Sequence, residues 1–276
     1  MAQLESGEFS LWTSYVYALT RISLDPSKGY LIETRLSPLL RQTGSKSYRE
    51  LLDRVVADST GALKREVIRS ITTNETSFFR DSSPFELLRL KVLPELLTAR
   101  AKAGGRLTLR IWSAACSTGQ EVYSIAIACK ETLHDLNKHD VRILGTDISD
   151  KVVGQASAGR YTKLELDRGL PPDKVNAYFR PDGTDFKITD PIRALASFRT
   201  LNLLEPLSFP SKFDIVFCRN VAIYFAEADK RLLFEAIARV MAVDGYLVIG
   251  STESLTGIST RFEPKRHLRS VYYQLK

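Results

Sequence analysis

Short apolar or β-branched runs alternate with longer runs of helical periodicity from about residue 107 to the C-terminus. The first of these runs are LTLRIWSA, QEVYSIAIACKETL and VRILGTDIS, and the pattern continues through FDIVFCRN, RLLFEAIARVM and YLVIGS to VYYQL. Strands separated by helices at this spacing predict a mostly parallel, doubly wound sheet with right-handed crossovers. We therefore expect an α/β fold for this part of the chain.

The first 72 residues carry a different pattern, because their apolar positions recur with helical spacing only. Leu11, Tyr15 and Leu19 are one example, and Leu51 with Val55 is another. No segment of this region alternates like a strand, so we expect a bundle of four short helices. The chain is thus expected to divide into a helical domain, residues 1–72, and a larger domain, residues 73–276.

An insertion is expected at about residues 159–198, where the alternation of strands and helices lapses. This segment contains Pro171-Pro172 and the run FRPDGTDFKI, which reads as a hairpin with its turn at Asp182-Gly183. We therefore expect a small antiparallel β-subdomain inside the larger domain.

Composition narrows the classes of function. The 276 residues include 39 Lys+Arg and 32 Asp+Glu, a formal net charge of +7 that favours an acidic partner without naming one. We find neither the pattern of a signal peptide nor a run of eighteen apolar residues, so a cytoplasmic protein is expected. The three histidines, His134, His139 and His267, lack metal-ligand spacing, so no metal is expected.

Polar side chains follow the first two predicted strands of the sheet, where ligands bind in open α/β folds. The segment SAACSTGQE follows the first strand, and its Gly119 would let the backbone approach a ligand closely. Glu121 falls in the first turn of the next helix, and Asp147 ends the second strand where a ribose diol is usually held. Each signal is weak alone, since the segment lacks G-x-G-x-x-G and an acid at a strand end is often a helix cap.

Two later strand ends add to this cluster. Asn202 and Leu203 follow SFRTLNL, while Arg219 and Asn220 follow FDIVFC and lead into VAIYF with Tyr224. Together these residues predict a nucleoside pocket. A tyrosine like Tyr224 is more often a core residue with a paired hydroxyl than a catalytic group, so its position after Arg219-Asn220 carries the argument.

Upstream of the sheet, the segment TTNETSFFRD spans residues 72–81. It can be interpreted as a capped helix start with two core phenylalanines. However, TNETSFFRD, SAACSTGQEVYSIA, GTDIS, NLLEP and FCRNVAIYF together resemble, in order and approximate spacing, the chemotaxis receptor (protein-glutamate) methyltransferases of the CheR type. The resemblance covers nearly the whole chain, and the combination of RNVxIYF with TNxTxFFR makes it specific.

The resemblance implies a fold and an activity. The fold would be an N-terminal all-α domain followed by a Rossmann-like methyltransferase domain with a small inserted antiparallel β-subdomain. The activity would be methyl transfer from S-adenosylmethionine to glutamate side chains of bacterial chemoreceptors, giving methyl esters and S-adenosylhomocysteine. The resemblance also implies a cytoplasmic enzyme recruited to membrane receptors, where its partners are the cytoplasmic methylation helices.

The resemblance also implies roles for individual residues. Arg80 and Tyr224 would lie close to the transferred methyl and hold the incoming carboxylate. The cofactor-binding residues would be Asn74, Thr76, Arg80, Glu121, Asp147, Asn202, Leu203, Arg219 and Asn220. A glutamate with a pKa near ~4.3 is already ionised at neutral pH, so no general base is required and positioning can carry catalysis.

Two features bear on the partner. The basic residues of the helical domain, among them Arg35, Arg41, Arg65 and Arg69, are either the solvated face of helices or a surface that steers acidic receptor helices. The turn PDGTD at residues 181–185 is shorter than the loops with which some relatives grip a receptor tail peptide, which argues against tail-peptide docking.

Other functions remain as alternatives on the sequence alone. Positive charge and RNVAIYF at a strand end suggest a nucleic-acid methyltransferase, although the sequence shows no basic stripe with interleaved aromatics. A non-catalytic module that senses the cofactor would be expected to lack Arg80 or Tyr224, and both are present. A dehydrogenase ranks last, because the first strand is not followed by the glycines that a pyrophosphate requires.

Overall fold

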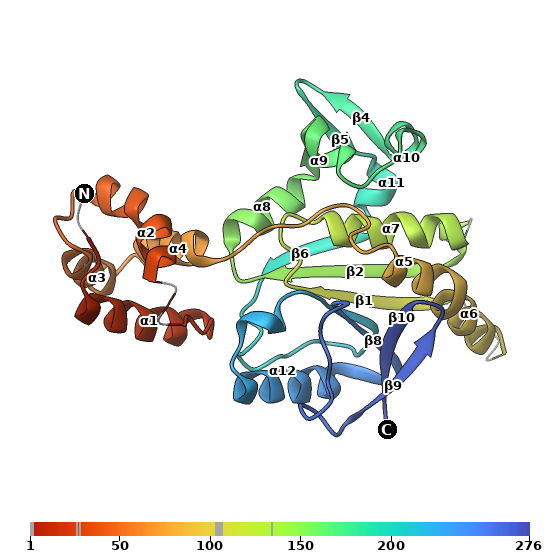
Figure 1. The fold of residues 1–276 in the computed structure, drawn as a ribbon. Helices are drawn as coiled ribbons and strands as arrows, with labels where there is room; N and C mark the ends of the chain where they lie inside the picture. Colours follow the sequence, from red (N-terminus) through yellow and green to blue (C-terminus); the bar gives the residue numbers. More distant parts are fainter. Residues whose placement is uncertain (1–2, 26, 28, 103–106, 134) are drawn as a thin grey trace.

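The computed structural model describes residues 3–25, 27, 29–102, 107–133 and 135–276. Figure 1 shows a group of helices at the N-terminal end joined by an extended linker to a larger part built on a twisted sheet, as the sequence predicts. A smaller sheet projects from the larger part.

The N-terminal helices pack around a core of their own. Tryptophan and branched aliphatic side chains at helical spacing form it, including Trp12, Leu36 and Leu51, all fully buried. Ser47 caps the third helix by accepting a hydrogen bond from the Glu50 backbone N–H at 3.1 Å. The helices are α1 (Ser6–Thr20), α2 (Gly29–Thr43), α3 (Tyr48–Ala57) and α4 (Ala62–Ile71).

The large sheet has seven strands in the order β6-β2-β1-β7-β8-β10-β9. The first five in this order pair in parallel, and the last two are antiparallel. The chain fills the sheet outward from β1 on one side and then returns to β7 on the other, so the strand order reverses between β1 and β7. The strands are β1 (Thr108–Ala114), β2 (Asp140–Asp147), β6 (Ala196–Thr200), β7 (Phe213–Cys218), β8 (Met241–Ile249), β9 (Phe262–His267) and β10 (Ser270–Leu275).

Two cores lie on the two faces of this sheet. Alternate strand residues point to opposite faces, so Ile111 and Phe217 join one core while Trp112 and Val216 join the other. Helices before and after β1 cover the first face, and one long helix, α12 (Glu227–Val240), covers the second (Figure 1). The other helical elements are α5 (Ser83–Leu87), η2 (Leu88–Val92), α6 (Leu93–Lys102), α7 (Gln120–Leu133), η3 (Leu136–Lys138) and α8 (Asp150–Ala158).

The predicted hairpin is present within a three-stranded antiparallel sheet of order β3-β5-β4. Two details differ from the prediction. Asp182 pairs with Asp185, so the loop is Gly183-Thr184, with Gly183 at φ +67°, and lies one residue later than predicted. The expected end of the insertion also overlaps β6, which pairs with β2 from Ala196 onward. The elements are β3 (Arg160–Tyr161), α9 (Lys163–Asp167), α10 (Pro172–Tyr178), β4 (Phe179–Asp182), β5 (Asp185–Ile188) and α11 (Asp190–Arg193).

Several polar contacts hold the N-terminal helices against the sheet part, and two of them involve the carboxylates of Asp150 and Asp229. The Arg69 guanidinium of α4 bonds both carboxylate oxygens of Asp150 at the start of α8, each at 2.8 Å. The Tyr17 hydroxyl of α1 donates to the buried carboxylate of Asp229 in α12, also at 2.8 Å. These contacts fix the helical domain over the carboxyl ends of the parallel strands.

Candidate active site

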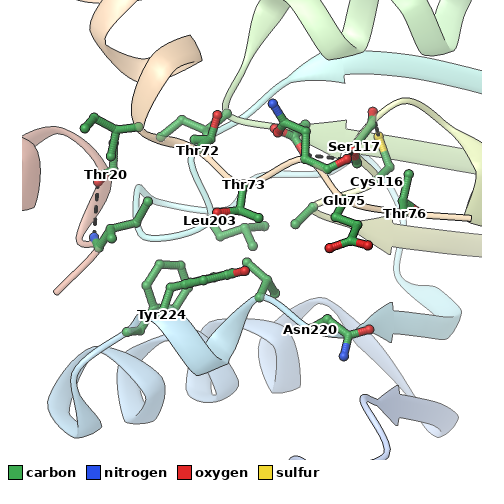
Figure 2. Close-up of a pocket in the computed structure, with 18 of the residues that line it drawn as sticks. Thr20, Thr72, Thr73, Glu75, Thr76, Cys116, Ser117, Leu203, Asn220 and Tyr224 are labelled. Atoms are coloured by element: carbon green, nitrogen blue, oxygen red, sulfur yellow. Dashed lines mark hydrogen bonds between the residues drawn. The ribbon is translucent and has the colours of Figure 1, made fainter. Parts of the chain in front are cut away.

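A cavity of about 210 Å³ lies at the carboxyl ends of β1, β2 and β7, between the sheet, the linker and the N-terminal helices. Figure 2 shows Thr73 and Thr76 of the linker on one side of it and Tyr224 and Asn220 on the other. The structure brings every predicted catalytic and cofactor-binding residue to this one cavity: Asn74, Thr76, Arg80, Glu121, Asp147, Asn202, Leu203, Arg219, Asn220 and Tyr224.

The loop after β1 is tied to the end of β2 and to the linker. The Ser117 backbone N–H donates to Oδ2 of Asp147 at 2.9 Å, and its hydroxyl donates to the carbonyl of Asn74 at 2.9 Å. Ala115 and Ser117 both have positive φ, +61° and +49°, which non-glycine residues rarely adopt. This local strain is compensated by the surrounding bonds, as is typical of functional loops.

Asp147 is 7% exposed and accepts two backbone N–H groups, from Ser117 at 2.9 Å and from Ser149 at 3.0 Å. Burial raises the pKa of this carboxyl, and the two backbone hydrogen bonds act in the opposite direction. Its oxygens can accept further hydrogen bonds, so a ligand with two neighbouring hydroxyls fits here.

The reason for a glycine at position 119 differs from our expectation. Gly119 does not line the cavity, and a Cβ built on it would lie 2.8 Å from Cβ of Ala156 and 3.0 Å from the Tyr161 hydroxyl. Its φ of +93° would also strain any other residue. Gly119 is therefore required by close packing of the loop against α8 and β3.

Arg80 lies in a linker segment with an unusual backbone. Phe79, Asp81 and Ser82 all have positive φ, at +48°, +65° and +29°, and each such residue costs roughly 1–3 kcal/mol. Buried Phe78 anchors the segment at one side, and Ser83 begins α5 at the other. Nη1 of Arg80 donates to the Glu75 carbonyl at 3.0 Å, so the guanidinium remains at the cavity.

Arg219 occupies the centre of a charged cluster rather than an open position on the cavity wall. Its side chain is 2% exposed, and its guanidinium bonds the carboxylates of Glu121 and Asp81, each at 2.8 Å. Nη2 also donates to the Arg80 carbonyl at 2.9 Å. Glu121 accepts a further bond from the Ser113 hydroxyl, so its carboxylate is held by two neighbours.

Asn202 and Leu203 form the part of the cavity near the N-terminal helices. The Asn202 side-chain amide donates to the Leu19 carbonyl of α1 at 3.2 Å, and its oxygen accepts the Leu204 backbone N–H at 3.1 Å. Leu203 is buried and joins the core under α12. This side chain can cover an apolar face of a ligand such as a purine ring.

The segment after β7 carries Tyr224 in a short 3₁₀ turn, η4 (Ala222–Tyr224). Asn220 adopts φ +57°, and its backbone N–H is held by Oε2 of Glu253 at 2.8 Å. The Tyr224 carbonyl accepts the Ser23 backbone N–H at 3.0 Å, whereas its hydroxyl has no hydrogen-bond partner among the residues that the structure describes. The hydroxyl is thus available to a ligand.

Sequence reasoning missed several contributors. Glu253 holds the backbone N–H of Asn220, and Asp81 holds the guanidinium of Arg219. Glu253 follows the run YLVIGS, a strand end that could have indicated it, whereas Asp81 follows no strand. The N-terminal helices also supply lining residues, including Arg35, which bonds the Ile71 carbonyl and, at 2.8 Å, the Thr73 hydroxyl. The sequence indicates Arg35 only as part of a basic face, because helical periodicity cannot show which side meets another domain.

We find no group of three His, Cys, Asp or Glu side chains that could hold a metal in the described part of the chain, which does not include His134. Cys116 lines the cavity but is buried, and burial raises the pKa of its thiol. No described helix has the length and apolar character needed to span a bilayer.

The residues present fit S-adenosylmethionine. That molecule offers a ribose diol, a purine and an amino-acid carboxylate. The buried Asp147 carboxylate suits the diol, Asn202 with Leu203 suits the purine, and the Arg80 guanidinium suits a carboxylate.

Comparison with known proteins places the chain in one family. The family model described as CheR methyltransferase, all-alpha domain, matches residues 7–72, and that described as CheR methyltransferase, SAM binding domain, matches residues 74–270. The chain is 39% identical to chemotaxis protein methyltransferase 1 of Pseudomonas aeruginosa over 98% of both chains. It is 40% identical to chemotaxis protein methyltransferase 1 of Vibrio cholerae over 92% of both, and 38% identical to chemotaxis protein methyltransferase Cher2 of Pseudomonas putida over 98% of both.

Proposed function

The chain belongs to the CheR family of chemotaxis protein methyltransferases, and from this premise we propose that Arg80 and Tyr224 hold the receptor glutamate for methyl transfer. The protein is an S-adenosylmethionine-dependent enzyme that methylates glutamates of chemoreceptors. When bound, S-adenosylmethionine supplies an electrophilic sulfonium methyl, which a carboxylate oxygen attacks as the C–S bond breaks and S-adenosylhomocysteine leaves.

Arg80 and Tyr224 have different tasks in this proposal. Both line the cavity, Arg80 from the linker and Tyr224 from the 3₁₀ turn after β7. The Arg80 guanidinium attracts and aligns the carboxylate, and the Tyr224 hydroxyl donates to one oxygen so that the other faces the methyl. Because the glutamate is ionised at neutral pH, neither residue removes a proton, and alignment with exclusion of water supplies the rate.

The proposed cofactor contacts follow from the cavity lining. Asp147 would accept the ribose hydroxyls, and Asn202 and Leu203 would contact the adenine. Asn74 and Thr76 would approach from the linker, with Arg219 and Glu121 supporting the same side through their ion pair at 2.8 Å. The assignment is carried by the single observation that all these residues meet at one cavity.

We propose a division into a helical domain, residues 1–72, and a methyltransferase domain, residues 73–276, with an inserted β-subdomain at about 159–198. The end of α4 at Ile71 and the separate core of the N-terminal helices support the first boundary. The start of β6 at Ala196 favours ending the insertion just before it.

Membership of the family implies chemoreceptors as substrates, and we propose which part of the receptor this enzyme meets. We expect the cytoplasmic methylation helices of the receptor to reach the cavity, so the enzyme acts on the cytoplasmic side of the membrane. Arg69 is engaged with Asp150, so among the basic residues it contributes to domain docking rather than to a free receptor-facing surface.

The two-residue Gly183-Thr184 loop supports the proposal that the enzyme does not dock a receptor tail peptide. Titration with the C-terminal peptide of the receptor tests this proposal, and micromolar binding would overturn it.

The decisive experiment combines the protein with methyl-labelled S-adenosylmethionine and membranes that carry a bacterial chemoreceptor. Mild alkali releases carboxyl methyl esters as volatile methanol, whereas N-methyl groups remain. We expect receptor-dependent volatile label, and Arg80→Ala should reduce it at least 100-fold with an unchanged melting temperature. Near-normal turnover of Arg80→Ala would refute the proposed role of Arg80, and alkali-stable label would indicate an amine or nucleic-acid substrate.

A further inference from the structure

The backbone around Arg80 adopts a conformation that its own residues disfavour. Three of the four residues from Phe79 to Ser82 have positive φ, and one of them is a phenylalanine, for which this is uncommon. Such a segment persists only when contacts with the rest of the molecule hold it. The contacts that hold this segment therefore determine where Arg80 points.

The buried cation Arg219 makes two of these contacts, and the Phe79 backbone N–H makes another by donating to the Ser124 hydroxyl at 2.9 Å. Nη2 of Arg219 bonds Oδ2 of Asp81 at 2.8 Å and the carbonyl of Arg80 at 2.9 Å. The same guanidinium is oriented from the other side by Glu121 at 2.8 Å and lies over the Phe85 ring at 5.8 Å. Arg219 is thus fixed to the sheet part, and Asp81 is the side chain by which the linker attaches to it.

Asp81 does not itself line the cavity. Its carboxylate bonds Arg219, and Asp81 directly follows Arg80 in the chain, so it acts on the cavity through these two residues. Without the ion pair, the segment can relax its positive φ angles, and the Arg80 guanidinium would then leave its position beside Glu75.

We propose that Asp81, through its ion pair with Arg219, is a positioning residue for Arg80 in methyl transfer. The inference rests on the role of Arg80 proposed above. It predicts that neutralising Asp81 lowers the rate of methyl transfer more than it weakens cofactor binding, because Asp147, Asn202 and Leu203 make no contact with Asp81 and keep their places at the cavity.

The test is a double-mutant cycle with Asp81→Asn and Arg80→Ala, using the full chain and receptor-containing membranes. Asparagine tolerates positive φ, so Asp81→Asn keeps the backbone and size while removing the charge. Asp140→Asn is the matched control. Asp140 pairs with Arg142 at 2.8 Å, and its side chain is 32% exposed, against 34% for that of Asp81. Asp140 begins β2 and therefore lies at the end of the strand away from Asp147 and the cavity. Asp81→Gly replaces Asp81→Asn if the latter lowers the melting temperature, because glycine accepts this φ without steric strain.

We expect Asp81→Asn to reduce kcat about 10- to 100-fold, with a smaller change in the Kd for S-adenosylmethionine by calorimetry and with both quantities unchanged in Asp140→Asn. In a protein that already carries Arg80→Ala, adding Asp81→Asn should lower kcat less than twofold. Amide hydrogen exchange at residues 79–83 of the ligand-free protein should be at least tenfold faster in Asp81→Asn.

The outcomes separate the two proposals. Near-normal turnover of Arg80→Ala refutes the role of Arg80 itself. A strongly impaired Arg80→Ala supports the role of Arg80, and the positioning role of Asp81 is then judged separately. That role is overturned if Asp81→Asn retains kcat within threefold of the wild type. It is also overturned if Asp81→Asn lowers kcat by the same factor in the wild-type and Arg80→Ala proteins. Unchanged hydrogen exchange at residues 79–83 would overturn it as well.

Discussion

Replacing Asp147 by asparagine should weaken cofactor binding strongly and leave the fold nearly unchanged. The carboxylate already accepts the backbone N–H groups of Ser117 and Ser149, and an amide can accept only one of them well. Losing one of these hydrogen bonds costs about 1–3 kcal/mol of stability. Burial also disfavours the charged carboxylate, since it raises the pKa of Asp147, so a neutral amide at this position recovers part of that free energy. The net change in the free energy of unfolding should be small.

The loss of affinity for the cofactor is not offset by this relief of charge burial. A hydrogen bond from a ribose hydroxyl to a charged group contributes about 1.5–3 kcal/mol, which corresponds to a loss of affinity of roughly 10- to 100-fold. Isothermal calorimetry with S-adenosylmethionine measures this directly, and Asp140→Asn, at the other end of the same strand, is the control. A Kd for Asp147→Asn within threefold of the wild-type value would refute the assignment of Asp147 to the diol.

The pH dependence of stability and of cofactor affinity independently checks the role of Asp147. Because burial raises the folded-state pKa of Asp147 above the unfolded value of about 3.9, its contribution to stability is fully present below that value and is lost as pH rises through the folded pKa. Cofactor binding has the opposite trend, since the ionised carboxylate is the better acceptor. Affinity should therefore fall on acidification in the wild type before ordinary carboxyl groups titrate, and this step should be absent in Asp147→Asn.

Three further predictions concern other parts of the molecule. Tyr224→Phe should lower single-turnover methyl transfer roughly 10-fold with unchanged cofactor affinity, because one hydrogen bond to the carboxylate is lost; an unchanged rate would contradict the proposed role. Asp150→Asn should lower the free energy of unfolding in urea by up to about 1 kcal/mol, less in high salt, because its pair with Arg69 is about one-third exposed. The Arg69 hydrogen bond lowers the pKa of Asp150, so this contribution is present above the unfolded value near ~3.9 and disappears as pH falls through the folded pKa; a difference that persists at the acid end would argue against the pair. Burial raises the pKa of all three thiols, that of Cys129 to about 12, so a disulfide reagent such as Ellman's should label none in the native protein and three after unfolding; a fast-reacting native thiol would show that the cavity opens to Cys116.

Local patterns in the sequence were sufficient for the architecture and for the residues that lie at strand ends in the cavity. Periodicity distinguished the helical domain from the α/β domain, because the two element types repeat with different periods. The carboxyl ends of parallel strands meet at one edge of a sheet, so the positions of Asp147, Asn202 and Asn220 after their strands are enough to group them.

The tertiary structure alone decided which side chains are partners across the chain. Arg219 bonds Asp81 over a separation of 138 residues, and Arg69 bonds Asp150 over 81, and neither pair follows from a repeat in the sequence. Gly119 likewise owes its identity to α8 and Tyr161, which pack against it from later in the chain. Such contacts depend on how completed elements dock, and docking is governed by the shape and burial of whole surfaces rather than by the spacing of residues along one segment.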